Sequence, residues 1–551
     1  MNRQLVACLL VIGVSDIALS QTITGVVRES TTRAPVPGAV VVALDSTRRE
    51  VVRTLSDPAG RYRVVALTPV SHLRFMKIGF RPYETNVDFR SAGLHVEYDA
   101  TLDLLSSVLP SVRVLADSRC PARAETQDAY ALWEQARIGL LATIVAGASR
   151  PAQVVLAKYT QNLDEAGSKI VRNTAQLDSV AESLGTFAAV RSVGAFLHAG
   201  YTVDSAGHRI FLGPDATTLL DTAFLAGYCL SFVRHRADTG IVGVAFSPAT
   251  RRKGIVDITG TLWLNRSPVA LHELEFRYIG LERGAERFQP GGIVRFTTAG
   301  NGLSFISRWQ FRLVGATEDT LVDNDHAFVR QWPFLSLVGG EVARVVWADR
   351  TKWSQRLGTL RARVVQRDGR PATGRKVVLD DTNYWSVTDG FGVAMLSDLV
   401  PGPYTVRVWD ERLAKLGISI PTNVTFEAVR DSTLQRDVRA ATAEEFVVDR
   451  CVADKRWTYG DSTLVLGVVV RADGARVKRA SVDMDVLSTP GDPSPARRTY
   501  HTGSDGLFQL CGSPLAPGKD IRATARAGTS SGSITVRLAS GLTLVKLIVK
   551  E

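Results

Sequence analysis

Two short strings in this sequence contain residue types that could do chemistry, and the first is an H-x-x-E. His272 and Glu275 have the spacing that supplies two ligands in some zinc sites. They lie within VALHELEFRY, where alternation predicts a β-strand with His272 on the face of Leu274 and Phe276. In a regular strand His272 and Glu275 would point to opposite faces and could not share a metal. The sequence therefore predicts no metal site here.

The second string, Gly528 to Gly532, has the form G-x-S-x-G that positions a nucleophilic serine in some hydrolases. That chemistry needs a strand-to-helix turn and a later histidine, whereas SITVRL follows this string and the chain has no histidine after it. We interpret it as a turn between strands. The chain also has neither a phosphate-binding loop nor a dinucleotide-binding fingerprint. We therefore predict no catalytic residue, no cofactor and no enzyme activity.

The N-terminus, MNRQLVACLLVIGVSDIALSQ, has the pattern of a secretory signal peptide over residues 1–20. It combines a cationic start, an apolar stretch and small residues before a cut at Gln21. No later run reaches the roughly 18 apolar residues that a membrane-spanning helix needs. We expect a mature chain without a transmembrane segment, exported to the periplasm, the outer-membrane surface or the medium.

Four cysteines remain after that cleavage, and they predict two disulfides in an oxidising compartment. Three pairings are possible. We favour the pairing that keeps each bridge within one predicted domain. It joins Cys120 to Cys229 and Cys451 to Cys511.

The formal net charge is +11, and basic pairs such as Arg48-Arg49, Arg251-Arg252 and Arg497-Arg498 lie in polar, loop-like stretches. They are not interleaved with aromatic residues as on a nucleic-acid surface. We interpret them as solvated loops that favour anionic envelope surfaces, and expect no nucleic-acid partner.

Three similar segments occur in the sequence: SDPAGRYRV from Ser56, VTDGFGVAML from Val387 and TGSDGLFQL from Thr502. In each, an acidic residue and glycine predict a tight turn that leads into a half-buried strand. The predicted turn residues are Asp57, Gly60, Asp389, Gly392, Asp505 and Gly506. Three copies of one small antiparallel β-sandwich account for this pattern.

These residues resemble the carboxypeptidase regulatory-like family, a small transthyretin-like sandwich. Its pattern is matched by Gly25, by Pro35 to Val41 and by Thr54 to Tyr62, and less fully in the two later copies. The resemblance implies a module that does no chemistry itself and serves as a stalk or accessory domain.

The four domains that we predict are sandwiches at 21–108, 356–446 and 450–551 and a central α+β domain at 109–351. The central domain should have a helix over 125–146, another in LLDTAFLAGYC, and a curled antiparallel sheet. Its strand order resembles the half-barrel of lipoprotein carriers. Six aromatic residues could line an apolar pocket there or simply form core: Trp263, Phe276, Tyr278, Phe305, Trp309 and Phe311.

Two hypotheses for function follow. The first is a non-enzymatic, exported cell-envelope protein whose sandwiches act as spacers and as binding modules for a protein or glycan. The second is a carrier or sensor of a lipid or other apolar ligand held in the central domain. A peptidase-associated protein is a more distant alternative.

Overall fold

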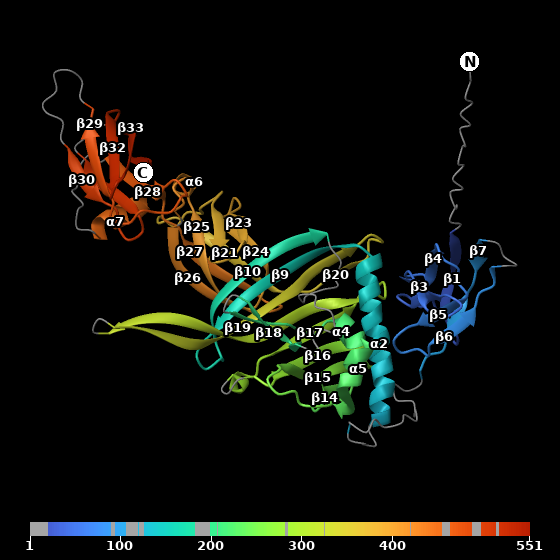
Figure 1. The fold of residues 1–551 in the computed structure, drawn as a ribbon. Coiled ribbons are helices and arrows are strands. Elements are labelled where there is room, and N and C mark those ends of the chain that lie inside the picture. The colour runs from blue at the N-terminus through green and yellow to red at the C-terminus, as the bar shows by residue number, and fades with distance from the viewer. Residues whose placement is uncertain are drawn as a thin grey trace, which may run out of the picture. The chain divides into compact units, whose positions relative to one another are not determined.

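The computed structural model describes a mainly β chain (Figure 1). The described residues are 20–89, 94–105, 120, 126–181, 199–205, 208–281, 285–323, 326–418, 420–453, 463–487, 497–513 and 517–550. The predicted signal peptide lies outside them, apart from residue 20. Contacts divide the chain into two compact units, Met1–Val171 with Asp178–Gln355 and Arg172–Leu177 with Arg356–Glu551. This division is coarser than the four predicted domains, whose boundaries remain predictions.

Three sandwiches share one strand order. In each sandwich one sheet has four strands. The other sheet has three strands in the second and third sandwiches and four in the first. The first comprises β1 (Gln21–Glu29), β2 (Val40–Leu44), β3 (Glu50–Leu55), β4 (Arg61–Ala66), β5 (His72–Met76), β6 (Tyr83–Asn86), β7 (His95–Glu97) and β8 (Ala100–Leu102). Its sheets are β4-β1-β7, with β8 also paired to β1, and β3-β2-β5-β6.

The second and third sandwiches repeat this arrangement as β24-β21-β27 with β23-β22-β25-β26, and β31-β28-β34 with β30-β29-β32-β33. The strands of the second are β21 (Gly358–Val365), β22 (Lys376–Leu379), β23 (Trp385–Val387), β24 (Val393–Leu399), β25 (Gly402–Trp409), β26 (Ile420–Ala428) and β27 (Thr433–Arg439). Those of the third are β28 (Thr463–Arg471), β29 (Ser481–Val486), β30 (Arg498–His501), β31 (Leu507–Ser513), β32 (Asp520–Ala527), β33 (Ser530–Arg537) and β34 (Leu542–Val549).

Each sandwich contains a parallel pairing of its first and last strands, which alternation along single strands cannot predict. The first strand pairs parallel with the last: β1 with β8, β21 with β27, and β28 with β34. A parallel pair requires a long connection between its strands. The whole sandwich supplies that connection, so its first and last strands lie side by side.

The recurring segment forms the turn between the third and fourth strands of each sandwich. Gly60, Gly392 and Gly506 occupy the same place with φ of 76°, 74° and 72°, a left-handed conformation that favours glycine. The carboxylates of Asp57 and Asp389 each accept two backbone N–H bonds across the turn. The third copy differs from the prediction, because Gly503 takes the place of these aspartates and Asp505 lies two residues further on.

A buried hydroxyl precedes each turn and ties it to the loop before the second strand. Ser56, Thr388 and Thr502 lie four residues before the turn glycines and are 1%, 4% and 3% exposed. Each hydroxyl donates to one backbone carbonyl and accepts from one backbone N–H at 2.6 to 2.9 Å. The side chain thus satisfies two buried backbone groups that no strand partner reaches.

Replacing this hydroxyl should destabilise the sandwich. In Thr388→Val, the carbonyl of Ala372 and the N–H of Arg375 lose their partner, so we expect the free energy of unfolding of the second unit to fall by about 1–3 kcal/mol. Urea denaturation measures the change. Thr425→Val, at an exposed strand position, is the control and should change stability by less than about 0.5 kcal/mol. Equal losses in both variants would contradict the role of the hydroxyl.

The central region is one large antiparallel sheet with helices packed against it, as predicted. Its strand order is β10-β9-β19-β18-β17-β16-β15-β14-β13, and β20 pairs with β19. The strands are β9 (Ala152–Leu163), β10 (Ile170–Ala181), β13 (Tyr228–Arg234), β14 (Ile241–Pro248), β15 (Asp257–Arg266), β16 (Val269–Ile279), β17 (Gly291–Thr298), β18 (Ser304–Asp323), β19 (His326–Trp347) and β20 (Lys352–Ser354). A separate hairpin joins β11 (Thr202–Ser205) to β12 (His208–Phe211).

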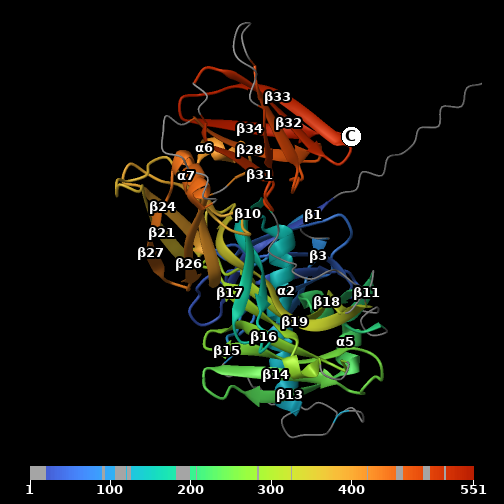
Figure 2. The same ribbon diagram turned by 90° about the vertical axis from the view of Figure 1, so that its left-hand side faces the viewer.

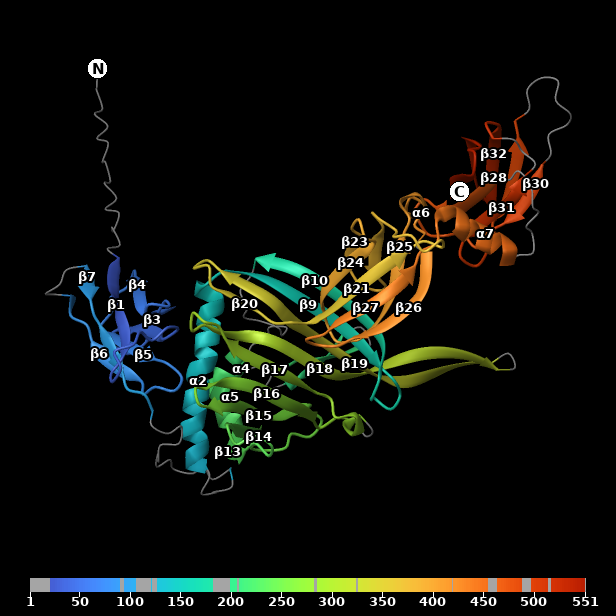
Figure 3. The ribbon, with the colours of Figure 1, turned by 180° about the vertical axis from the view of Figure 1, so that it is seen from behind.

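The β18–β19 hairpin is longer than the sequence suggested. The two strands pair with each other from Arg308 with Glu341 to Asp323 with His326, well past the last pairs that β17 and β9 contribute. Figure 3 shows it extending beyond the other strands of its own sheet.

The long helix α2 (Thr126–Ser149) runs across the strands (Figure 2) and confirms the helix predicted at 125–146. The second predicted helix is two short ones, α4 (Ala216–Leu220) and α5 (Thr222–Gly227). Asp221 ends the first and its carboxylate caps the N–H of Ala223 at the start of the second. Trp133 of α2 and Phe224 of α5 are fully buried in the core between these helices and the sheet.

The other side of α2 covers the first sandwich. Ala142, Val145 and Ala146 form one core with Val40, Val42, Leu44 and Leu55. These last residues lie on the outer face of the sheet β3-β2-β5-β6, meaning the face turned away from the partner sheet. Strand β2 is therefore buried on both faces, at every one of its positions.

Polar contacts fix this packing at its margins. The side-chain oxygen of Gln135 accepts from the N–H of Gly79 at 2.8 Å, and the Arg150 guanidinium donates to the Leu55 carbonyl at 2.8 Å. Lys77 donates to the carbonyl of Gly302 at 3.1 Å. Because burial removes its ammonium from water, the pKa of Lys77 falls to about 8.

Lys77 should make the stability of the first unit depend on pH. Its folded pKa lies below the ordinary value of 10.5, so the unfolded chain binds more protons, and stability should rise by about 1–2 kcal/mol between about pH 8 and 9.5. Urea denaturation at several pH values measures the rise. Lys77→Met should remove it, while Lys352→Met, at an exposed position, should keep it. A rise that survives Lys77→Met would contradict this assignment.

Both disulfides have the favoured pairing, Cys120 with Cys229 and Cys451 with Cys511. The second joins α7 (Ala443–Ala453) to β31 of the third sandwich. α7 and the short helix α6 (Glu411–Ala414) pack through Val447 and Leu413 against Leu466 of β28. These contacts connect the second and third sandwiches within their unit.

Candidate binding cleft of the central domain

The six aromatic residues considered for an apolar pocket are mostly core. Phe276, Tyr278 and Phe305 are 1%, 4% and 1% exposed, and the Tyr278 hydroxyl donates to the Leu212 carbonyl at 3.0 Å. Trp309 and Phe311 are partly buried and pack against the same core. Trp263 lies on the opposite face of the sheet, with its ring edge-to-face with that of His235. Their side chains thus do not converge on one space, and an apolar cavity stays a prediction.

The H-x-x-E and G-x-S-x-G strings lie in ordinary elements of β-structure. The pairing of β15 with β16 passes from Glu273 to Leu271, which leaves His272 as the extra residue of a β-bulge. His272 is therefore not on the regular face with Leu274, contrary to the prediction. The string from Gly528 forms the turn between β32 and β33, as expected.

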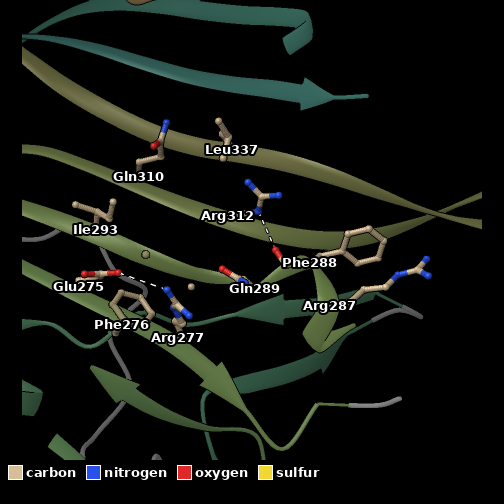
Figure 4. Close-up of a pocket in the computed structure, with 12 residues that line it drawn as sticks. Glu275, Phe276, Arg277, Arg287, Phe288, Gln289, Ile293, Gln310, Arg312 and Leu337 are labelled. Atoms are coloured by element: carbon tan, nitrogen blue, oxygen red, sulfur yellow. Dashed lines mark hydrogen bonds and ion pairs between the residues drawn. The ribbon is translucent and has the colours of Figure 1, made fainter. Parts of the chain in front are cut away.

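An open cleft of about 530 Å³ lies over strands β16, β17, β18 and β19 (Figure 4). The short 3-10 helix η1 (Glu286–Phe288) and Gln289 form one wall. The other lining residues are Glu275, Phe276, Arg277, Gly291, Gly292, Ile293, Gln310, Arg312 and Leu337. This volume is in the range of small-molecule sites.

In the floor of the cleft, a glycine lies between two arginines, one on each neighbouring strand. Arg277 of β16 pairs with Gly291 of β17, which pairs with Arg312 of β18. A Cβ at position 291 would lie 2.2 Å from the carbonyl oxygen of Phe276, so only glycine fits. Arg277 and Arg312 therefore lie on either side of a strand position that carries no side chain.

Arg312 is held in place, whereas Arg277 is loosely paired. Arg312 donates to the carbonyls of Phe288 at 2.8 Å and Gly167 at 3.3 Å. The closest carboxylate contact of Arg277 is with Glu275 at 3.9 Å, at the limit of an ion pair. Arg287 lies over the ring of Phe288 at 4.5 Å. Arg277 therefore keeps hydrogen-bonding capacity for a ligand.

A second cleft of about 570 Å³ adjoins the first, since both are lined by Arg277 and Gln289. It adds Arg251 and Glu286. Among the described residues, the two linings contain four arginines (Arg251, Arg277, Arg287 and Arg312) and two glutamates (Glu275 and Glu286), a surplus of two positive charges. The arrangement suits carboxylate, sulfate or phosphate groups.

This cleft was not predicted from the sequence. Arg251 and Arg252 both fit solvated loop residues there, but Arg252 is paired with the buried Asp257 at 2.8 Å while Arg251 lines the second cleft. The Gly291-Gly292 pair was a usable signal, because adjacent glycines in a strand mark close backbone approach. Only the strand register places Arg277 and Arg312 beside them.

Within the described ranges, no group of three or more His, Cys, Asp or Glu residues is placed to hold a metal ion. In the same part of the chain, no helix is long and apolar enough to cross a membrane.

Comparisons with known proteins identify one module. Residues 22–103 match the family model of the carboxypeptidase regulatory-like domain, and they coincide with the first sandwich. No curated protein matches the chain.

The solved structures that match this chain have low sequence identity to it and low TM-scores. They include the Bacillus anthracis TIE protein (10% identity, 62% of each chain covered, TM-score 0.15). A streptococcal ancillary pilin has 14% identity over 47% of this chain and 81% of its own, with a TM-score of 0.14. The shaft pilin SpaA from Lactobacillus rhamnosus GG has 7% identity over 36% and 97%, with a TM-score of 0.13. These scores are too low to carry an argument about function.

Arg312 should control the order of the cleft wall. In Arg312→Leu, the carbonyl of Phe288 loses its bond to the sheet, so we expect the backbone amides of segment 285–290 to exchange about tenfold faster or more. Hydrogen–deuterium exchange with mass spectrometry measures this. Arg295→Leu removes an arginine of the same sheet that pairs with Glu273 instead, and should leave segment 285–290 unchanged. Unchanged exchange in Arg312→Leu would show that the wall does not depend on this residue.

Proposed function

We propose that this chain is a non-enzymatic, exported protein of the cell envelope, in which three sandwiches act as spacers and binding modules and the central domain binds an anionic partner. The cleft with Arg277 and Arg312 on either side of Gly291 is the observation that carries the binding role. Export is supported by the N-terminal pattern and by two disulfides, which persist in oxidising compartments.

The ligand class that fits the cleft best is an acidic glycan. Guanidinium groups bind carboxylates through paired, charge-assisted hydrogen bonds. The side-chain amides of Gln289 and Gln310 both donate and accept, which matches sugar hydroxyls. The cleft opens along the sheet face, so an extended chain can lie in it. The apolar-ligand alternative is less favoured, because most of the aromatic residues proposed for it are packed in core.

The binding role predicts a charge-dependent affinity for uronic-acid oligosaccharides. Isothermal titration of the purified chain with oligogalacturonate should detect binding at physiological salt, and a neutral glucose oligomer should not bind. Arg277→Gln and Arg287→Gln should each weaken binding about tenfold, the loss expected for one charge-assisted hydrogen bond.

Arg63→Gln is the matched control, because it removes the same charge from an exposed position of the first sandwich. It should leave the affinity unchanged. Equal weakening by Arg63→Gln would mean that net charge alone attracts the glycan, and an absence of binding by the unsubstituted chain would reject the acidic-glycan proposal.

A further inference from the structure

The outer face of the four-stranded sheet can be compared position by position in the three sandwiches. The last residue of the third strand pairs directly with the second strand in each: Leu55 with Val40, Val387 with Lys376, and His501 with Ser481. Two residues earlier, Arg53, Trp385 and Thr499 occupy equivalent positions opposite Val42, Val378 and Asp483. Sequence and register therefore give three versions of one surface.

In the first sandwich this face is apolar and covered. Val40, Val42 and Leu55 are 0%, 4% and 1% exposed beneath helix α2. The helix contacts them with small apolar side chains, Ala142, Val145 and Ala146. The sheet geometry of this sandwich thus accommodates a helix with a stripe of small residues.

In the third sandwich the same face is polar and ion-paired. Asp483 accepts from the Thr499 hydroxyl at 2.7 Å and from the guanidinium groups of Arg497 and Arg526. The Thr499 bond and the nearby arginines lower the pKa of the Asp483 carboxyl. Such a face is compatible with water and requires no cover.

In the second sandwich the face is open and carries exposed apolar side chains beside one ion pair, in which Arg407, opposite Val378, pairs with Asp380. Trp385 is 60% exposed and Val387 49% exposed, and Phe391 in the adjoining turn is 80% exposed. The residues equivalent to Phe391 are Ala59 and Asp505, so neither of the other copies has an aromatic residue there. Exposed aromatic residues gathered on one face are typical of protein contact surfaces.

The centre of this open face has a positive charge. The Lys376 ammonium lies 4.7 Å from the ring centre of Trp385 and 5.5 Å from that of Trp409. A partner that covers the two rings would also remove this ammonium from water, which is costly unless a carboxylate pairs with it. Two copies of the face would place like charges together, which disfavours self-association.

We propose that the outer face of the sheet β23-β22-β25 is the docking site for an α-helix of a partner protein. The helix would present a stripe of small apolar residues to Trp385 and Val387, as α2 does to the first sandwich, and a carboxylate to Lys376. This site is distinct from the arginine cleft and does not depend on the glycan proposal.

Site-specific photocrosslinking tests this proposal in the producing cells. The full chain carries p-benzoylphenylalanine at position 387 or, as the equivalent control, at position 501, and irradiated adducts are mapped by mass spectrometry. We expect an adduct with a helical segment of a second protein from position 387 and none from position 501.

The captured protein is then purified, and its affinity for the intact chain is measured by surface plasmon resonance. Trp385→Thr copies the residue of the third sandwich and should weaken binding at least tenfold, whereas Arg53→Thr at the equivalent position of the first sandwich should not. An adduct with a second copy, with the chain's own first unit, or with glycan or lipid would overturn the proposal. So would the absence of an adduct, or an affinity that Trp385→Thr leaves unchanged.

Discussion

A β-sheet has two faces, and each apolar face must be covered; the structure depends on how each sandwich meets this constraint. The inner faces are always covered, because the two sheets of a sandwich pack on each other. The outer faces are where the copies differ. In the first, Val40 stands where the other copies have Lys376 and Ser481, and a helix of the central domain covers Val40 and Val42. The sandwich and the central domain consequently share one core.

The same constraint explains why the repeated turn is maintained while surfaces diverge. The buried hydroxyls of Ser56, Thr388 and Thr502 bond backbone groups that every copy has, whatever its surface residues are. The turn glycines are likewise required by the backbone, because each has a positive φ. Outward-facing side chains on the strands neither bond these backbone groups nor set the turn conformation. They can therefore differ between copies and form a helix contact, an aromatic surface or an ion-paired surface.

The sequence was sufficient for the sandwiches, the long helix and the disulfide pairing, because each leaves a local or countable signal. Alternation and turn residues predict strands, and the four remaining cysteines restrict the pairings. The sequence was insufficient for features that depend on the register between paired strands. The bulge at His272, the parallel pairing of β1 with β8, and the juxtaposition of Arg277 with Arg312 all depend on which residues meet across strands. The sequence likewise left open whether the six aromatic residues form core or line a pocket, because alternation does not show what each face contacts.

The central claim is that one sandwich architecture presents a covered face in its first copy and an open aromatic face in its second. Hydroxyl-radical footprinting of the purified, monomeric chain measures both faces in a single experiment, because oxidation rates follow side-chain exposure. The account predicts rapid oxidation of Trp385 and Phe391 and slow oxidation of Leu55 and Met76, which lie at the α2 contact. Protection of Trp385 equal to that of Leu55 in the monomer would contradict the claim, since the chain itself would then cover the second face.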